Sequence, residues 1–470
     1  MADRSQKRDD FFRVQSHTDD MTFYLNTLSK VLTAGDLTAR ELTETCLEAI
    51  SSEDGNRAFM EVYSNRVRIE ADHIDKARQN GLALPPFAGI PLSIKDLFDV
   101  KGEVTRAGST IMADNAAAKK DAPVVSRLKA AGFILIGRTN MTEFAFSGLG
   151  MNPHYGDPRS PFERQIDGGR VAGGSSSGSA VSISDGMAPA TIGSDTGGST
   201  RTPAAFCGIV GFKPTSTRMS GVGVFPLSTS FDASGPMGSS VNCCAILDNL
   251  MAGGINQTET AFPVKNLRLA IPIGYLFDDL DDHVANCFTA AIEALSAAGA
   301  IIKEMPIAPI EAMRPSNNTK SIVAAEAYAL HRDRLESDTV AHYDPYIAHR
   351  LAGGEDISAT DYINMLATRK KVWADVHTVT QYFDALILPT SPTLPPTLDT
   401  LDSIAAKTTI NARCLRNTSV SNYLDQPTIT LPCHGAGTAP VGISLMGPRL
   451  HDRRLFAIAA GVEKILNAAR

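Results

Sequence analysis

Two short segments of the chain combine glycine with several hydroxyl side chains, a composition that suits a serine active site. They are GGSSSGSA at residues 173–180 and GSDTGGSTRTP at residues 193–203. Acyl transfer needs a serine nucleophile, a base that takes its proton, and backbone N–H groups that face the developing oxyanion. Gly197 and Gly198 lack side chains, so they can turn their N–H groups toward one point. The pattern indicates Ser199, which follows them, as a nucleophile beside its own oxyanion hole.

The base must come from elsewhere in the chain, because neither segment contains histidine, cysteine or lysine. A neutral lysine can fill this role, as Ser–Lys variants of the catalytic triad show. A phosphate-binding loop is a competing interpretation of the glycines. Gly168 and Gly173 have the spacing of that loop, but Gly174 stands where the loop requires lysine, so the sequence disfavours nucleotide binding.

The sequence also matches the GxSxG motif of another class of serine enzymes. GSSSG has the form GxSxG with Ser176 in the middle, and Asp384 and His434 follow in the order of α/β-hydrolases. That serine must follow a buried strand directly, whereas the preceding PFERQIDGGRVAG is polar and rich in glycine. We therefore expect this match to be accidental.

The Ser-x-x-Lys motif of penicillin-binding enzymes fits Ser126 and Lys129. These residues lie in APVVSRLKAAG, whose apolar spacing predicts an amphipathic helix with both side chains on the solvated face. The companion motif KTG is absent from the chain. We therefore expect Ser126 and Lys129 to be surface residues.

The segment from 173 to 215 resembles the signature of the amidase signature family along its whole length. Flanking pieces agree with it: GIPLSIKD at 89–96, GRTNMTEFAFSG at 137–148 and DALILPTSP at 384–392. The likeness covers roughly residues 30–466, nearly the whole chain. A match of this length with fixed spacing is far more specific than any of the short motifs above.

The resemblance implies a Ser–Ser–Lys triad. We expect no metal or other cofactor, because the 10 histidines are dispersed and none pairs with another at ligand spacing near the serine segments. Ser199 matches the nucleophile, Ser175 the bridging serine that follows a cis peptide bond, and Lys95 the base. The backbone of residues 196–199 matches the oxyanion hole, and a further pair matches one that braces this loop in the family. The oxyanion-hole residues are Thr196, Gly197 and Gly198, and the bracing pair is Asp195 and Arg201.

Lys95 would have to be an unusual lysine. Ile90, Leu92 and Ile94 alternate with Ser93 and Lys95, which predicts a strand whose lysine ordinarily faces solvent. To act as a base near neutral pH, its pKa must fall about 3 units below the ordinary 10.4, which corresponds to roughly 4 kcal/mol. Burial, or hydrogen bonding to the neutral amine, would supply that shift.

Three positions depart from the family pattern without touching the triad. Ser177 stands where glycine is usual, Thr200 replaces isoleucine and Arg138 replaces lysine. Because they lie close to the proposed site, they make substrate assignment by analogy less secure.

The elements that must position these residues read as an α/β fold. Residues 21–80 are helical in pattern, with a Thr cap before RELTETCLEAI. The pieces FAGIPLSIKDLFDV, FILIG, FDALILPTSP and PTITLP read as strands, and HVANCFTAAIEALSAAGA as an amphipathic helix. We expect a helical N-terminal region at 1–80 packed on a catalytic core at 81–470, as one large domain. The resemblance implies a large mixed sheet with helices on both faces.

The charge and composition of the chain disfavour some kinds of binding partner and some locations in the cell. The 470 residues carry 44 basic and 51 acidic side chains, a formal charge of −7, which disfavours nucleic acid and anionic membranes as partners. No apolar run spans a bilayer, the first residues lack a secretion signal, and the 7 cysteines form no CxxC pair. We expect a cytoplasmic, metal-free enzyme with reduced thiols that forms a homodimer.

The expected reaction is hydrolysis of a C–N bond in a small or aryl amide. The aromatic residues of the regions that should set specificity suggest such a substrate weakly: Phe144, Phe146, Tyr155, Tyr328, Tyr346 and Tyr423. Two alternatives within the family remain open. One is a hydrolase of carbamates, ureas or biuret-type compounds, and the other is the glutaminase subunit of a tRNA-dependent amidotransferase.

Overall fold

The computed structural model describes residues 24–166, 168–255, 260–314 and 321–469, and it is built on one 11-stranded sheet. The strand order is β1-β3-β2-β4-β6-β5-β10-β11-β9-β7-β8. Strand β2 runs parallel to β3 and β4, and β7 runs parallel to β8 and β9. The other neighbouring pairs are antiparallel, so the sheet is mixed, as predicted. The strands are β1 (Phe59–Val62), β2 (Pro91–Lys95), β3 (Ile134–Thr139), β4 (Ala190–Asp195), β5 (Val210–Lys213), β6 (Ala233–Gly238), β7 (Arg268–Ile273), β8 (Ile301–Pro306), β9 (Ala385–Pro389), β10 (Thr428–Pro432) and β11 (Gly442–Met446).

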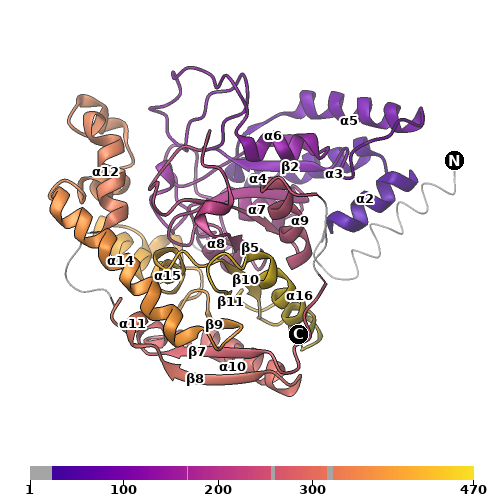
Figure 1. Cartoon of the computed structure of the whole chain (residues 1–470). Helices are drawn as coiled ribbons and strands as arrows, with labels where there is room; N and C mark the ends of the chain where they lie inside the picture. Colours follow the sequence, from indigo (N-terminus) through magenta and orange to yellow (C-terminus); the bar gives the residue numbers. More distant parts are fainter. Residues whose placement is uncertain (1–23, 167, 256–259, 315–320, 470) are drawn as a thin grey trace.

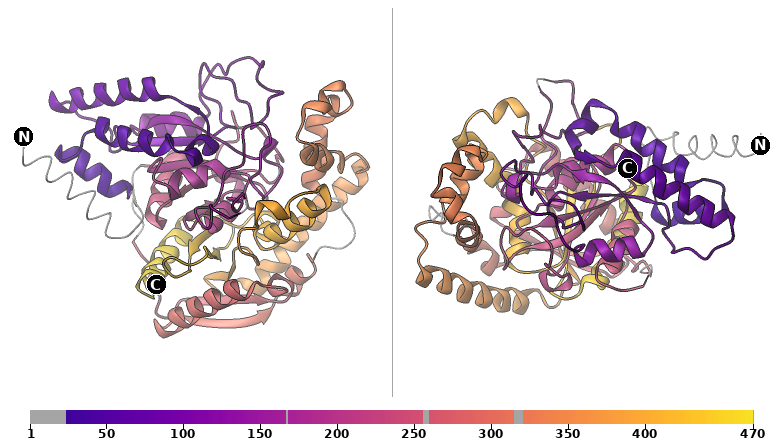
Figure 2. Two further views of the ribbon diagram at one scale, coloured as in Figure 1. Left: turned by 180° about the vertical axis from the view of Figure 1, so that it is seen from behind. Right: turned by 90° about the horizontal axis from the view of Figure 1, so that it is seen from above.

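Helices cover both faces of this sheet (Figure 1). On one face α6, α9, α16 and α10 pack against one another in turn, and on the other α7, α8 and α15 do so. Figure 2 shows α12 and α14 at the opposite side of the molecule from α2 and α5. The α-helices are α2 (Leu25–Ala34), α3 (Ala39–Ile50), α4 (Glu53–Ala58), α5 (Ser64–Gln79), α6 (Pro123–Ala130), α7 (Ser177–Ser184), α8 (Arg201–Phe206), α9 (Val241–Met251), α10 (Asp282–Ala297), α11 (Ala308–Glu311), α12 (Ile322–Leu335), α13 (Pro345–Ala352), α14 (Ala359–Thr380), α15 (Ile404–Tyr423) and α16 (Asp452–Ala469).

The N-terminal region is helical with one exception. Thr38 caps α3 in a capping box with Glu41, as the Thr before RELTETCLEAI predicted. The expectation of an entirely helical segment is wrong at β1, which pairs with β3 and extends the sheet. Its four residues are too few for periodicity to distinguish a strand from a helical turn. Residues 1–23 of the predicted region lie outside the described residues.

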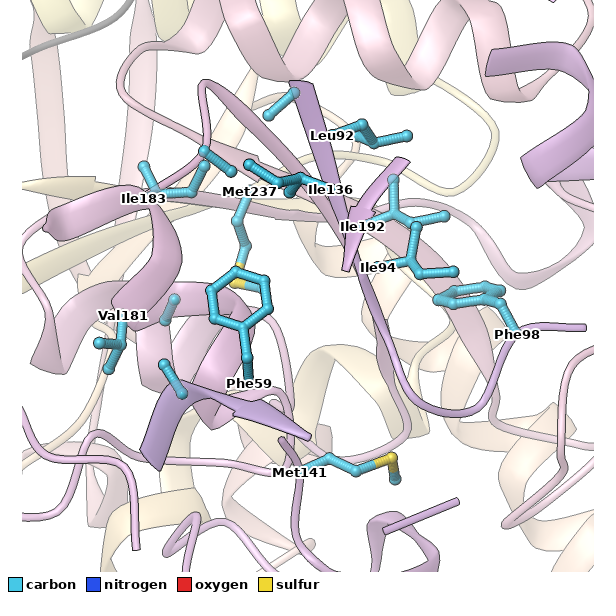
Figure 3. Packing of buried hydrophobic residues seen from close by; sticks show 14 of the residues in the cluster. Phe59, Leu92, Ile94, Phe98, Ile136, Met141, Val181, Ile183, Ile192 and Met237 are labelled. Carbon is cyan, nitrogen blue, oxygen red and sulfur yellow. The ribbon is translucent and has the colours of Figure 1, made fainter. Parts of the chain in front are cut away.

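The strands that lead to the site are buried on both faces. Every residue of β2 is buried, so Ser93 and Lys95 do not face solvent as the polar side chains of an alternating strand ordinarily do, and Lys95 has the burial that a base requires. The physical reason is that parallel strands inside a large sheet are covered by helices on each side. In Figure 3, Leu92 and Ile94 of β2 lie in the same apolar cluster as Ile192 of β4. This packing fixes β2 and β4 side by side with their carboxyl ends at the same edge of the sheet.

Candidate active site

Lys95 is the last residue of β2, and its side chain is fully buried. Its Nζ lies 2.7 Å from Ser175 Oγ and 2.8 Å from Ser194 Oγ. Burial lowers the pKa of Lys95 to about 7, although the negative charges of Asp195 and Asp232 act in the opposite direction. A substantial fraction of Lys95 is therefore a neutral amine near neutral pH, which is the form that can accept a proton.

Ser175 begins the turn into α7. The Gly174–Ser175 peptide bond is cis, as the resemblance implied. The turn is held by backbone hydrogen bonds from Gly174 N to Gly148 O at 2.8 Å and from Thr142 N to Ser175 O at 3.1 Å. These contacts come from the segment that follows β3, so the turn that carries Ser175 is held by that segment.

Ser199 lies in the turn between β4 and α8, and it is 5% exposed. Its carbonyl oxygen accepts a hydrogen bond from Ser176 N at 3.2 Å, which joins the two glycine–serine segments directly. Its Oγ makes no hydrogen bond to any described residue, so the expected bond to Ser175 is not formed here. Catalytic hydrogen bonds are often longer without substrate and tighten in the complex.

Asp195 and Arg201 form a fully buried ion pair that braces this turn. Arg201 donates through Nε and Nη2 to the two carboxylate oxygens, at 3.0 and 2.9 Å. Burial raises the pKa of Asp195, but Arg201 and the hydrogen bonds outweigh it and hold this pKa well below its ordinary value. Thr200, one of the departures from the family pattern, adds a hydroxyl bond to Asp195 at 2.9 Å.

One of the three predicted oxyanion-hole residues, Gly198, uses its N–H group inside the turn. Gly198 N donates to Asp195 Oδ1 at 2.8 Å, so this N–H belongs to the brace of the turn. The N–H groups of Thr196, Gly197 and Ser199 make no hydrogen bond to any described residue. These three are the donors that remain available to a substrate oxygen in this turn.

Helix α15 supplies contacts to the turn that the sequence did not indicate. Thr418 Oγ1 donates to Gly197 O at 2.8 Å, and Asn422 Nδ2 donates to Asp195 Oδ1 at 2.8 Å. Ser194, the partner of Lys95, sits one residue before the noted aspartate and could have been found from its position at the end of a strand. Thr418 and Asn422 carried no such signal, since more than 200 residues separate them from the turn.

The competing serine motifs do not assemble in the structure. Asp384 is paired with Arg268 and Arg454, and His434 Nδ1 contacts Val441. Ser176 Oγ donates to Ser194 O at 3.3 Å. Ser126 and Lys129 are exposed on α6, as expected. Within the described ranges no three histidine, cysteine or acidic side chains gather as metal ligands, and no helix is long and apolar enough to cross a membrane.

None of the 7 cysteines forms a disulfide bond, and Cys433 is the one of them that is only partly buried. Burial raises the pKa of the buried thiols Cys46, Cys207 and Cys414, which disfavours the reactive thiolate. The cysteines therefore have the environment of apolar core residues, as expected from their scattered positions.

Comparison with known proteins shows the family of the chain. Residues 41–456 match the protein family described as Amidase. The chain is 33% identical over 437 residues to 2-amino-5-chloromuconic acid deaminase of Comamonas testosteroni, with 92% of this chain and 93% of that protein covered. It is 35% identical over 381 residues to AtzE, the 1-carboxybiuret hydrolase subunit of Pseudomonas sp. strain ADP, covering 78% and 81%.

Two further similarities extend the comparison. A glutamyl-tRNA(Gln) amidotransferase subunit of Chloroflexus aurantiacus is 31% identical over 468 residues, covering 92% of this chain and 94% of that protein. A crystal structure of an amidase superposes with a TM-score of 0.83 at 30% identity, covering 94% of this chain and 99% of that one. The chain therefore belongs to the amidase signature family, whose members are hydrolases that act on carbon–nitrogen bonds.

Proposed function

We propose that this enzyme hydrolyses the C–N bond of a small linear amide through an acyl-enzyme formed on Ser199. The observation that carries the proposal is the fully buried Lys95, whose Nζ lies 2.7 Å from Ser175 Oγ and whose pKa is lowered to about 7. Both hydrogen-bond partners of its Nζ are hydroxyl groups rather than carboxylates, so Lys95 is poised to exchange a proton with a serine.

In the first step, Ser199 Oγ attacks the amide carbonyl carbon and its proton passes through the Ser175 hydroxyl to neutral Lys95. The negative charge that develops on the carbonyl oxygen is received by backbone N–H groups of the turn at residues 196–199. The C–N bond then breaks as the protonated Lys95 returns the proton through Ser175 to the leaving amine. The products of this half-reaction are an ester at Ser199 and a free amine or ammonia.

In the second step, water replaces the amine. Neutral Lys95 takes one proton from the water molecule through Ser175 while the oxygen attacks the ester carbon. The second tetrahedral intermediate collapses, Ser199 regains its proton, and the carboxylic acid leaves. Using the same base twice follows from microscopic reversibility, because the proton path of the first half-reaction is reused.

Three of the six aromatic side chains that suggested an aryl substrate lie in the core. Phe144 is 1% exposed and packs against Phe225, His331 and Tyr343. Phe146 and Tyr346 are also buried. Since these rings belong to the core, we propose a small amide and keep aryl amides as members of the test panel.

A biuret-type or urea-type substrate is the second candidate, and the relative named as a 1-carboxybiuret hydrolase subunit supports it. Such a substrate would pass through the same acyl transfer and release an unstable carbamic acid, which loses carbon dioxide. A third candidate is a glutaminase subunit that needs a partner chain, in line with the relative from the glutamyl-tRNA(Gln) amidotransferase. We also propose that the chain forms a homodimer.

The test is an activity profile of the purified chain on simple amides, aryl amides, carbamates, ureas and glutamine, with the Ser199→Ala variant as control. We expect release of amine or ammonia from a simple amide and no release by the variant. Carbon dioxide as a product would instead assign the urea-type reaction. Activity on glutamine alone, together with a monomer in size-exclusion chromatography with light scattering, would favour the partner-dependent glutaminase.

A further inference from the structure

A second carboxylate, on Asp232, holds the first residue of the oxyanion turn. Thr196 Oγ1 donates to Asp232 Oδ1 at 2.5 Å. The other oxygen, Oδ2, accepts the N–H groups of Leu227 and Ser228 at 2.9 and 3.0 Å. All three partners are donors, so they stabilise the ionised form of Asp232, which only accepts hydrogen bonds.

The segment that contains Asp232 is also anchored on its other side. Glu326 of α12 accepts hydrogen bonds from Ser228 Oγ at 2.6 Å and from Ser230 N at 3.0 Å, and it also accepts the Ser230 hydroxyl. Tyr362 of α14 donates to the same carboxylate at 2.7 Å. Residues 227–232 are therefore held between the helices α12 and α14 and the turn that carries Ser199.

Asp232 acts on Lys95 through its charge. The negative charges that oppose the loss of a proton from Lys95 belong to Asp195 and Asp232. Asp195 is already paired with Arg201, whereas the cation that acts on Asp232 is Lys95 itself. Burial raises the pKa of Asp232 to about 6, against the hydrogen bonds from Thr196, Leu227 and Ser228. Above that pH, Asp232 is mostly ionised and contributes its charge to the site.

We infer that Asp232 is a positioning residue of the proposed reaction: its carboxylate fixes Thr196 at the start of the oxyanion turn, and its negative charge acts on Lys95. The inference rests on the proposed role of Lys95. It adds a group that belongs neither to the triad nor to the Asp195–Arg201 brace. Through Ser228 and Glu326 it also joins the turn to α12.

The experiment compares pH–rate profiles of the wild type and Asp232→Asn on the substrate found in the activity profile. The neutral side chain removes the negative charge, so the acid limb should move to lower pH by about 1 unit. Its amide cannot accept all three donors, so kcat should fall by roughly 10- to 100-fold, the size expected for a displaced oxyanion donor, while KM changes less. A purely structural role would lower stability without moving the limb.

Glu326→Gln is the matched control, because it makes the same acid-to-amide change on the far side of residues 227–232. Glu326 is not among the charges that act on Lys95. The acid limb of the pH–rate profile of Glu326→Gln should therefore coincide with that of the wild type. Thr196→Val is the second variant should Asp232→Asn fail to fold. It removes one donor to Asp232, which makes that carboxylate easier to protonate. Its limb should move in the same direction by a smaller amount.

The Lys95→Arg variant, measured in the same experiment, distinguishes failure of the proposed mechanism from failure of the role of Asp232. Retained amidase activity in Lys95→Arg would overturn the proposed mechanism as a whole. An inactive Lys95→Arg, together with a wild-type limb and wild-type kcat in Asp232→Asn or Thr196→Val, would overturn the role of Asp232 alone. Circular dichroism and melting temperature of each variant report that the fold is retained.

Discussion

At the scale of single residues, the chemistry depends on the hydroxyl of Ser199, which has no hydrogen bond to any described residue and follows a glycine turn. We expect Ser199→Ala to lower kcat on amides by at least about 10⁴-fold, as removal of a serine nucleophile does elsewhere. Melting temperature should change by only a few degrees, because one oxygen is lost from a nearly buried site. A fluorophosphonate should label the wild type at Ser199, shown by peptide mass spectrometry. Unaltered labelling in the variant would mean that another serine is the nucleophile.

The second residue-scale prediction concerns pH. The pKa of Lys95 is lowered to about 7, and the active form is the neutral amine. The rate should therefore be low below pH 7 and rise as pH increases through that value. The ordinary pKa of histidine is close to this value, so the acid limb of the pH–rate profile alone does not identify the base. Lys95→Arg should lose several orders of magnitude in kcat for amides, because arginine keeps its proton at any working pH.

The matched control for that experiment is His434→Ala, which removes the base of the rejected GxSxG interpretation around Ser176. Wild-type activity is expected, since His434 contacts Val441 rather than Ser176. Activated esters give a further check. Their leaving groups need no proton, so Lys95→Arg should impair ester hydrolysis less than amide hydrolysis. Equal loss on both substrates would argue against proton delivery by Lys95.

At the scale of elements, the site is a contact between the turn after β4 and helix α15. Gly198 has φ +134°, and a Cβ added there would lie 2.2 Å from Thr418 Oγ1. We expect Gly198→Ala to displace the turn and lower kcat about 100-fold, the effect of a shift near 1 Å in a reacting group. Gly435→Ala is the control, since its nearest neighbour would be 3.9 Å away. Steady-state kinetics of both variants test this, and normal activity in Gly198→Ala would show that the turn adapts.

The sequence predicted the residues of the proposed triad better than the distant residues that hold them in place. Ser199, Ser175 and Lys95 lie in segments with local signals, namely glycine turns and an alternating strand. Alternation along the strand would by itself place Lys95 in solvent, because it does not reveal that helices cover both faces of the sheet. The burial of Lys95 was expected only from the resemblance and from the lowered pKa that a base requires. Asp232 and Asn422 were not predicted, since an isolated aspartate or asparagine gives no indication of which distant backbone it contacts. Strand β1 was missed because four residues show no period.

At the scale of the whole molecule, one sheet connects all the described parts of the chain. Strand β5 pairs with β6 on one side and with β10 on the other, so it joins the two halves of the sheet. Unfolding either half would leave an edge of β5 and its apolar neighbours exposed. We therefore expect the two halves of the sheet to unfold together, in a single step.

The only tryptophan of the chain makes this testable. Trp373 lies on α14, and its Nε1 donates to Tyr423 O at the end of α15. Its fluorescence reports on these helices, while far-UV circular dichroism reports on the whole fold. The two urea midpoints should coincide within experimental error. A fluorescence transition at clearly lower urea would show that α14 and α15 unfold first, and the single-step description would fail.

The bracing of the turn by α15 has a consequence for directed evolution of this enzyme. A gene library confined to residues 173–215 would vary the nucleophile loop while its supports at Thr418, Asn422 and Asp232 stayed constant. Most altered loops in such a library would pack against residues that fit the original loop sequence and not the new one. Recombination that exchanges this segment alone between distant relatives would combine a loop with supporting residues from another protein in the same way. Libraries that draw residues 195–201, 227–232 and 418–422 together from one parent keep each loop with its own support.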